Sequence, residues 1–415
     1  MVVGDTSSAS QHSSRPRSLE EVLDRFLDSA GVLADEEVSL RDGVGRHLAS
    51  PPVARVPNPV EDSVGLDGFA VRAADAKESG IVLHVVGRGF PGRPFDGTTE
   101  AGQAVVVATG APLPKGSDAV VPVEEVEPFP GDATRIRLLH RVRPWQSVRF
   151  RGEDVAGGQV LLKPGHRIGP GCLALLAAAG ISSVRVHRRP RVGILPTGSE
   201  LTPPGHLPGP GQVLDGNSPM LESLLSMFGA DVRVLPGVPD DPGALDAAFR
   251  AALPSVDLLV TTGGASVGEP DLVRPALRRI GAAVHDGPMA IKPGKPFFWA
   301  RWEDHLVAGL PGNPASAWVT ALLLVAPVIR RLSGARDVHL PTVPGVLAEP
   351  LSNPGDRRQF FRVVMDQEGA VRLAGIQASH HITSLAQANG LVDQPAGLHW
   401  PVGTPVRVIR WGLLE

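Results

Sequence analysis

The sequence has little cysteine, little net charge and no long uninterrupted apolar run. Its single cysteine, Cys172, excludes an internal disulfide and is typical of a reducing compartment. A formal net charge of -3 argues against nucleic-acid binding as the main activity. No apolar run reaches the ~18–20 residues that a membrane span needs, and the first residues lack the apolar core of a secretory signal. We therefore expect a cytoplasmic protein that binds neither nucleic acid nor membranes.

The residues that are abundant indicate several packed domains joined by many turns. The length of 415 residues predicts roughly three domains, and a hydrophobic content of 42% is enough for packed cores. The 48 glycines and 41 prolines make up about a fifth of the chain, just below the level at which low complexity becomes the default. Residues 1–17 carry almost no large apolar side chain, so we expect a disordered tail there.

Two separate segments are expected to form a helical domain. Ser18 is a predicted N-cap, and an apolar stripe that includes Leu19, Val22 and Phe26 follows it at helical spacing. A second apolar helix is expected at residues 172–179, ended by Gly180. We predict that residues 18–50 and 141–182 form one domain, in which the second helix packs beside the first.

Residues 51–140, between those segments, are predicted to be an inserted β-domain. Short β-rich runs alternate with glycine and proline turns, and we expect strands at residues 81–86, 104–108, 119–123 and 135–139. A G-x-G-x-x-G pattern at Gly87, Gly89 and Gly92 falls inside this region. Prolines and no helical pattern follow it, which indicates a strand end and a turn rather than a dinucleotide site.

The remainder of the chain predicts an α/β domain at residues 183–333 and a small β-domain at residues 334–415. In the first, strands are expected at residues 191–195, 231–235, 256–260 and 305–308, with one or two more around 289–299. Helices are expected at residues 219–228, 242–253, 271–280 and 314–331. Such alternation favours a mainly parallel sheet with helices on both faces, so the fold class is multidomain α/β plus β.

The stretch at residues 256–271 has the form of a ligand-binding turn. A short apolar strand leads into Gly263 and Gly264, and a helix start follows at Pro270 and Asp271. This arrangement presents backbone N–H groups to an anion. A βα turn without any ligand is the alternative interpretation, because glycine loops are common.

Polar loops should gather at the carboxyl edge of the predicted sheet, where ligands bind in open parallel sheets. The loops at residues 197–200, 240–242, 261–264 and 309–314 carry glycines and several carboxylates, and Lys292 and Lys295 lie nearby in sequence. Carboxylates can hold Mg²⁺ while lysines and amides bind phosphate, so a phosphate compound with a divalent metal is expected. Helix capping alone is the alternative role for Asp240, Asp241 and Asp271.

Two other motifs offer competing interpretations. Gly294 and Lys295 do not belong to a phosphate-binding P-loop, because Pro296 stands where a metal-binding Ser or Thr is needed. Residues 264–268 form G-x-S-x-G around Ser266, between a predicted strand and helix, which is the context of a hydrolase nucleophile. A serine hydrolase therefore stays open, and labelling of Ser266 by a fluorophosphonate would favour it.

Long motifs throughout the chain resemble the molybdopterin molybdotransferase family, which is related to the C-terminal domain of gephyrin. They include the segments at residues 66–72, 108–114, 152–154, 197–201, 240–242, 262–271, 292–296 and 310–314. The resemblance implies a helical domain, an inserted β-domain, an α/β pterin-binding domain and a C-terminal β-barrel, in a homodimer. It also implies that molybdate is inserted into adenylylated molybdopterin with Mg²⁺ and that AMP is released.

The resemblance implies roles for individual residues. The positions that match the family's catalytic residues are Asp67, Thr109, Asp154, Glu200, Asp240, Asp271 and Lys292, and Glu200, Asp240 and Asp271 would hold the metal. The positions that would bind substrate are Gly263, Gly264, Ser266, Lys295, Pro311, Gly312, Asn313, Pro314, Arg362 and Ser379. Taken alone, Asp67 is typical of a turn and Arg362 of a solvated strand residue.

The chain departs from the family pattern at Leu66, Phe69, Ser199, Pro288 and Ala378, which bears on substrate affinity more than on reaction type.

Two further functions remain open. A non-catalytic scaffold would bind the pterin without releasing AMP, and an enzyme that adenylylates the pterin would consume ATP.

Overall fold

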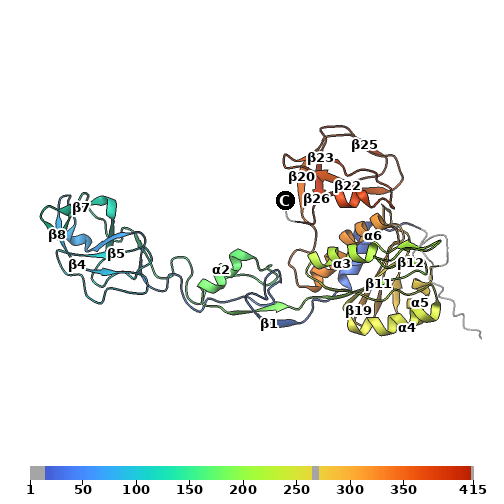
Figure 1. Cartoon of the computed structure of the whole chain (residues 1–415), viewed down its shortest axis with the longest axis horizontal. Coiled ribbons are helices and arrows are strands. Elements are labelled where there is room, and N and C mark those ends of the chain that lie inside the picture. The colour runs from blue at the N-terminus through green and yellow to red at the C-terminus, as the bar shows by residue number, and fades with distance from the viewer. Residues whose placement is uncertain (1–14, 264–270, 413–415) are drawn as a thin grey trace, which may run out of the picture.

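The computed structural model describes residues 15–263 and 271–412 of the chain. Figure 1 shows an elongated molecule, with a β-rich part at one end and an α/β part carrying a β-barrel at the other. Arg17, which was expected to lie in the disordered tail, pairs instead with Met289, and its backbone N–H donates to Pro288 O at 2.9 Å.

The first helix, α1 (Leu19–Asp28), packs into the α/β part rather than beside the second helix. Ser18 caps it, as predicted, by accepting a hydrogen bond from Glu21 N at 3.1 Å. Phe26 is fully buried and stacks on Trp299 with ring centroids 5.3 Å apart. The expected packing of the two helices is therefore wrong, because the apolar stripe of α1 finds its complementary surface on the α/β core.

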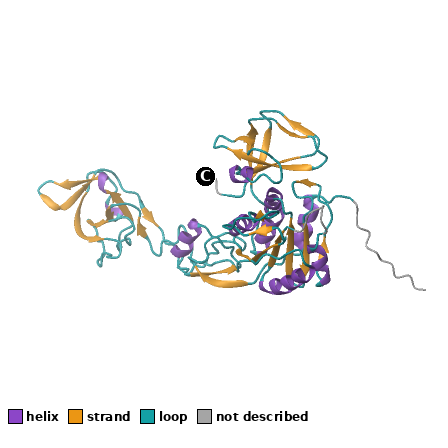
Figure 2. Cartoon of the chain, turned by 45° about the vertical axis from the view of Figure 1, so that its right-hand side comes forward, coloured by secondary structure: helices purple, strands orange, loops and turns teal. Residues whose placement is uncertain are grey.

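A narrow middle region joins the two ends. Strands β1 (Asp35–Ser39) and β10 (Ser183–His187) pair antiparallel, although about 150 residues of chain separate them. Helix α2 (Pro170–Ala178) covers this ribbon, and its Leu176 is buried with Leu48 and Ile168. Figure 2 shows that the middle region is mostly loop with little regular structure.

The far end is a six-stranded sheet in the order β6-β3-β5-β4-β8-β7. The β-rich character expected for this segment is confirmed, and the strands are β3 (Gly68–Val71), β4 (Val82–Gly89), β5 (Gln103–Val107), β6 (Ala119–Pro122), β7 (Val126–Phe129) and β8 (Asp132–Leu138). Short elements beside them are β2 (Ser63–Val64), β9 (Val148–Arg149), η1 (Ala73–Asp75) and η2 (Val123–Glu125). Gly87 and Gly89 lie within β4, and Gly92 follows at a φ of 73°, so the pattern is a strand end and a turn, as predicted.

The α/β part contains a second six-stranded sheet, in the order β14-β11-β15-β19-β18-β16. The first four strands, β14 (Asp231–Val234), β11 (Arg191–Pro196), β15 (Leu258–Thr262) and β19 (His305–Leu310), are parallel. Strand β18 (Phe298–Trp302) runs antiparallel to β19, and β16 (Ala283–His285) runs antiparallel to β18. Short elements beside the sheet are β12 (Leu201–Thr202), β13 (Val213–Leu214) and η3 (Leu253–Ser255). The predicted mainly parallel sheet is confirmed.

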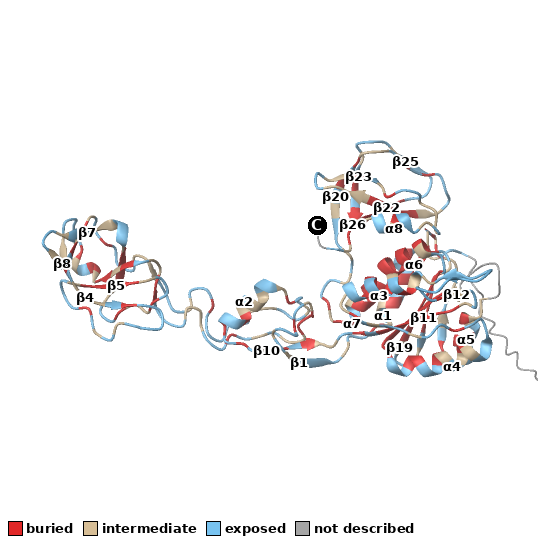
Figure 3. Cartoon of the chain, viewed as in Figure 1, coloured by how far each residue is buried: buried red, intermediate tan, exposed pale blue. Residues whose placement is uncertain are grey.

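Helices cover both faces of this sheet, because its strands are apolar on both sides. On one face α1 packs with α3 (Asn217–Met227), α6 (Pro314–Thr320), the π-helical turn η4 (Ala321–Val325) and α7 (Ala326–Leu332). On the other face lie α4 (Pro242–Ala252) and α5 (Val273–Arg279). Figure 3 shows the buried residues concentrated between these layers.

Three helix starts differ from the expected positions. Helix α2 begins at Pro170, two residues early, because proline suits the first helical position. Helix α3 begins at Asn217, two residues early, because the Asp215 carboxylate accepts a hydrogen bond from Ser218 N at 3.0 Å. Helix α5 begins at Val273, two residues late, because the Asp271 carboxylate accepts from Val273 N at 3.0 Å.

The segment Pro314–Leu332 is long and apolar enough to cross a membrane. No uninterrupted apolar run of this length stands out in the sequence, because Ser316 and Thr320 divide it. In the structure 89% of the most apolar window is buried inside the protein. This segment is therefore the central core helix of the α/β part.

The C-terminal part is a closed five-stranded barrel, which confirms the expected β-barrel. Strands β22 (Arg358–Met365), β23 (Ala370–Leu373), β20 (Thr342–Leu347), β26 (Pro405–Ile409) and β24 (Gly390–Gln394) follow one another, and β24 pairs back with β22. Beside them lie β21 (Leu351–Asn353), β25 (Leu398–Trp400) and α8 (Thr383–Gln387). Strand β17 (Ile291–Lys292), from the α/β segment, pairs parallel with β22 and so joins the barrel to the loops of the α/β part.

Candidate functional site

The loops that leave the parallel strands meet at one edge of the α/β sheet. Thr197 N donates to Thr262 O at 2.9 Å, and Gly198 N donates to Val238 O at 3.0 Å. Ser199 and Asp240 exchange hydrogen bonds of 3.1 and 3.0 Å. The predicted convergence of the loops after β11, β14 and β15 is therefore confirmed.

Glycine is required where two of these loops touch. Gly263 has a φ of 101°, and a Cβ there would lie 2.0 Å from the carbonyl oxygen of Thr197. A Cβ on Gly312, in the loop after β19, would lie 3.6 Å from the Cα of Gly263. The backbone of Thr197 therefore leaves no room for a side chain at position 263, and the backbone of Gly312 lies beside Gly263. Gly264 and Ser266 fall outside the described residues, as does the hydrolase motif.

Asn217 connects the same loops, and the sequence indicated only a helix cap for it. Its Nδ2 donates to Thr262 Oγ1 at 2.9 Å and to Gly312 O at 2.7 Å. Its Oδ1 is buried and has no partner among the described residues. The sequence offered one signal for this role, because an asparagine stands at the start of a helix that follows the sheet's carboxyl edge. Sequence spacing could not show that its side chain also reaches the Gly312 loop.

The acidic residues of this edge have different surroundings. Glu200 and Asp240 are exposed, and the Glu200 carboxylate folds back so that a Cβ on Gly198 would lie 2.5 Å from it. Asp271 caps α5 and forms an ion pair with Arg274. For Asp271, the structure therefore shows the capping interaction that was considered as the alternative.

The three acids expected to hold a metal do not gather into a cluster. Among the described residues, no group of three or more His, Cys, Asp or Glu side chains is placed to ligate one ion. Mg²⁺ is commonly held by one or two carboxylates together with substrate phosphates and water. Glu200 and Asp240 fit that arrangement, whereas the ion pair with Arg274 occupies Asp271.

Lys292 and Lys295 stand on a rigid turn between the α/β part and the barrel. Lys292 pairs with Gln359 across β17 and β22, and both lysine side chains are exposed. Gly294 between them has a φ of 124°, and a Cβ there would lie 2.6 Å from Thr320 Cγ2. The turn is held against α6, and it presents two ammonium groups to solvent.

Arg362 is fully buried, so the solvated environment that its sequence suggested is wrong. Its Nε donates to Ser384 Oγ at 2.8 Å, and its Nη2 donates to the carbonyl oxygens of Ile376 and Ala378 at 2.9 and 3.2 Å. Burial lowers the pKa of Arg362 to about 10, which leaves it charged at neutral pH. Its Nη1 is buried without a partner among the described residues.

The loop that Arg362 supports carries Ser379 to the start of α6. Asn313 Nδ2 donates to Ser379 Oγ at 3.2 Å, and Ala315 N donates to Ser379 O at 3.0 Å. Pro311 is buried, while Pro314 forms the first turn of α6. Residues 311–314 and 379, which are distant in sequence, are therefore neighbours between the sheet edge and the barrel.

Asp67, Thr109 and Asp154 do not join this edge within one chain. Asp67 Oδ1 accepts hydrogen bonds from Thr109 N and Oγ1, each at 2.8 Å, and these two bonds lower the pKa of Asp67. Asp154 accepts from Asn58 Nδ2 at 3.0 Å. Asp67 and Thr109 flank β3 and β5, which Figure 1 places at the opposite end of the molecule from β11 and β19.

Three family descriptions match the chain in succession. They are the MoeA N-terminal region (domain I and II) over residues 17–180, a probable molybdopterin binding domain over residues 193–331, and the MoeA C-terminal region (domain IV) over residues 344–411. Two crystal structures of the molybdopterin biosynthesis MoeA protein from Pyrococcus horikoshii resemble this chain. Their TM-scores are 0.81 and 0.82 at 30% and 27% identity, over 96% of this chain and 100% of each of those.

Curated relatives extend over nearly the whole length. The molybdopterin molybdenumtransferase of Haemophilus influenzae is 35% identical over 378 residues, which cover 90% of this chain and 93% of the relative. The protein of the same name from Bacillus subtilis is 33% identical over 403 residues, covering 95% and 94%. The chain therefore belongs to the molybdopterin molybdenumtransferase family.

Proposed function

We propose that this chain inserts molybdenum from molybdate into adenylylated molybdopterin and releases AMP. The observation that carries the proposal is the convergence of the β11, β14, β15 and β19 loops on one sheet edge, in a chain of this family. Such an edge is where open parallel sheets bind ligands.

In this proposal the backbone and the lysines bind the phosphates. The close approach of Gly263 and Gly312 lets a ligand reach their backbone groups. Lys292 and Lys295 are exposed on the adjoining turn, where their ammonium groups would neutralise phosphate charge. The pterin end would then lie toward Asn313 and Ser379, which hydrogen-bond each other beside the barrel.

We propose that Glu200 and Asp240 hold Mg²⁺ together with oxygens of the substrate phosphates. When bound, the ion would polarise the phosphate bond that breaks as AMP leaves. Ser199 N donates to the Asp240 carboxylate and so fixes its direction. Asp271 is assigned a positioning role, because its carboxylate holds the start of α5 and Arg274.

The molybdate oxyanion is proposed to bind beside Ser379. The buried guanidinium of Arg362 donates to Ala378 O in that loop and so places a positive charge beside it. Its Nη1 has no hydrogen-bond partner among the described residues and can donate to an oxyanion. Since three of its hydrogen bonds fix the guanidinium, it would stabilise an oxyanion without reorganising.

A homodimer would complete the site. Strand β5, which Thr109 and its partner Asp67 adjoin, lies at the opposite end of the molecule from the sheet edge (Figure 1), and Asp154 bonds to Asn58 instead of to a loop of that edge. We propose that these three residues meet the edge of a second copy. Two impaired variants, Asp67→Ala and Asp240→Asn, should then reach about a quarter of wild-type activity when co-expressed and purified together, because about half of the dimers are mixed and each mixed dimer carries one intact site of two. If the mixture stays inactive, Asp67 does not act on a second copy.

AMP release from adenylylated molybdopterin in the presence of molybdate tests the function directly. The proposal expects AMP release that depends on molybdate and consumes no ATP. A scaffold would bind the pterin and release no AMP, whereas an adenylylating enzyme would consume ATP. Glu222→Gln, an exposed acid on α3, is the matched control for changes at Glu200.

A further inference from the structure

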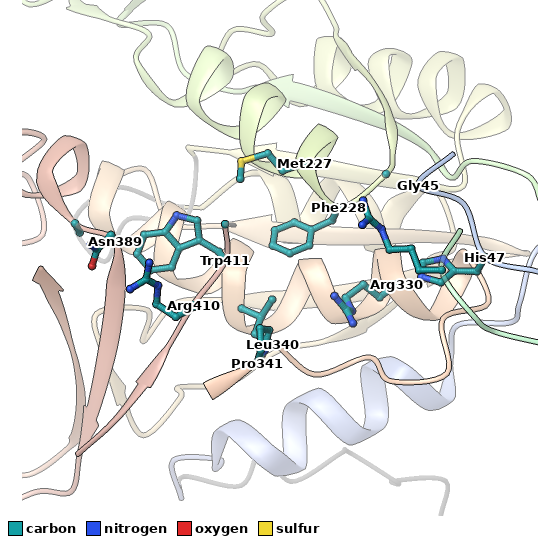
Figure 4. A pocket seen from close by; sticks show the side chains of 14 residues that line it. Gly45, His47, Met227, Phe228, Arg330, Leu340, Pro341, Asn389, Arg410 and Trp411 are labelled. Atoms are coloured by element: carbon teal, nitrogen blue, oxygen red, sulfur yellow. The ribbon is translucent and has the colours of Figure 1, made fainter. Parts of the chain in front are cut away.

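A cleft of about 710 Å³ lies where the middle region, the α/β part and the barrel meet. Figure 4 shows His47 and Arg330 at one end, Arg410 and Trp411 at the other, and Phe228 between them. Its volume is within the range of small-molecule sites.

This cleft is distinct from the carboxyl edge of the sheet. Helix α3 begins at that edge with Asn217 and ends beside the cleft at Met227, a distance of roughly 16 Å for eleven helical residues. The long core helix likewise begins near Asn313 and carries Arg330 at its far end. The two sites therefore lie at opposite ends of the same helices.

Three guanidinium groups line the cleft, those of Arg167, Arg330 and Arg410, and within residues 15–263 and 271–412 none of them forms an ion pair. Arg330 instead donates from Nε and Nη2 to the backbone oxygen of Asp337, at 3.1 and 2.8 Å. Arg410 is only 7% exposed, and its Nε has no partner among the described residues.

The groups around the cleft respond to this excess of positive charge. Burial, with a smaller contribution from the charges of Arg330 and Arg167, lowers the pKa of His47 to about 4, so His47 is neutral at pH 7. Burial also lowers the pKa of Arg330, an effect that Asp337 opposes and Arg167 reinforces. Crowding of like charges in a partly buried site is unfavourable unless an anion binds there.

The floor of the cleft is aromatic. Phe228 lies at its centre, and Trp411 lies near Arg410 (Figure 4). Trp318 packs edge-on against Trp411 with centroids 4.4 Å apart, which fixes the indole ring. Rings of this kind stack on a planar ligand, while guanidinium groups bind phosphate by forked hydrogen bonds.

We propose that this cleft binds a compound that contains both a planar aromatic ring and a phosphate, as a nucleoside monophosphate does. The phosphate would be held by Arg330 and Arg167, and the ring would lie along Phe228 and Trp411. This proposal does not rest on the function proposed for the carboxyl edge, because the two sites share no side chain.

Calorimetric titration of the full chain with AMP tests the proposal, with Trp411 fluorescence as the local signal. We expect AMP to quench Trp411, with no such change in Trp411→Phe, and inorganic phosphate and adenosine to bind more weakly than AMP. Arg330→Gln and Arg167→Gln should each weaken this binding by about tenfold or more, since each removes a charged phosphate contact. Arg331→Gln, an exposed arginine beside Arg330 that does not line the cleft, should bind as the wild type does.

Other results would overturn the proposal. Equal AMP affinity in wild type, Arg330→Gln and Arg167→Gln would place the nucleotide elsewhere. Absence of any Trp411 response at millimolar AMP would show that the cleft does not bind a compound with an aromatic ring and a phosphate. A change in oligomeric mass in Arg330→Gln with unaltered AMP binding would show that a second copy of the chain covers the cleft. Circular dichroism of each variant separates loss of binding from loss of fold.

Discussion

The two edges of the α/β sheet use charged residues in opposite ways. At the amino edge, Asp257 is buried and accepts hydrogen bonds from Arg188 at 2.6 and 2.7 Å and from Arg191 N at 2.8 Å. At the carboxyl edge, Glu200 and Asp240 are exposed and form no ion pair with a described residue, and backbone hydrogen bonds and the uncharged side chain of Asn217 hold the loops. The charges of one edge stabilise the fold, and those of the other remain available to a ligand.

This difference predicts that substitutions at the carboxyl edge reduce activity while substitutions at the amino edge reduce stability. The following variants test that separation, from the largest expected effect to the smallest.

Gly263→Ala should have the largest effect. Its methyl group would lie 2.0 Å from Thr197 O, so the two loops must move apart. A displacement of about 1 Å at a reacting site lowers a rate by about 100-fold, and we expect at least that loss of AMP release. Gly281→Ala is the control, because Gly281 has a similar φ of 92° and open space around it. Similar activity loss in both variants would attribute the effect to backbone strain alone.

Asp240→Asn should reduce AMP release by about 10- to 100-fold, as the loss of a group that holds or orients a metal commonly does. Because the side chain is exposed, the urea midpoint should not change. Asp231→Asn removes an exposed carboxylate beside the amino edge and should leave the rate unchanged. Restoration of the rate in Asp240→Asn by higher Mg²⁺ concentration would support the metal role, and indifference to Mg²⁺ would contradict it.

Asp257→Asn should destabilise the α/β part by about 2 kcal/mol near neutral pH and leave the rate of AMP release within twofold. Burial alone raises the pKa of Asp257, but hydrogen bonds from Arg188 and Arg191 outweigh burial and lower the pKa to about 2. The carboxylate therefore stabilises the native state above pH ~4, and this contribution is lost as the pH falls toward 2. Urea unfolding of the wild type and of Asp257→Asn at pH 7 and pH 3 measures this contribution. If both proteins lose the same stability between pH 7 and pH 3, the Asp257 carboxylate is not its source.

Asn217→Ala should have the smallest effect of the carboxyl-edge variants, about a tenfold lower rate, from the loss of two hydrogen bonds between the Thr262 and Gly312 loops. If Asn217 only positions the loops, the Michaelis constant and the rate constant should both change while the pH profile stays the same. A changed pH profile would instead assign Asn217 a direct contact with substrate.

Much of the fold could be predicted because it depends on local patterns. The alternation of short apolar runs with helical stripes predicts β11, β15 and β19 to within one or two residues. Parallel strands require the loops that follow them to meet at one edge, which is why residue order alone places Thr197, Gly263 and Gly312 together.

The failures share one cause, which is that they depend on contacts between distant segments. The stripe of α1 indicated a buried face, but not that Phe26 would stack on Trp299. Arg362 is a charged residue in a strand, and only the surrounding oxygens of Ser384, Ile376 and Ala378 make its burial favourable. Asp271 stood where a metal ligand was expected, and the pairing with Arg274 includes a distant segment, because Arg274 Nη2 also donates to Pro296 O.

The sequence by itself determined the order of the domains, the parallel sheet and the glycines that its loops require, because these follow from periodicity and from backbone conformation. Only the tertiary structure decided which acids are paired, which arginine is buried and which three arginines face a common cleft. Those outcomes depend on distances between segments that lie tens to hundreds of residues apart, and no local pattern of residues encodes such distances.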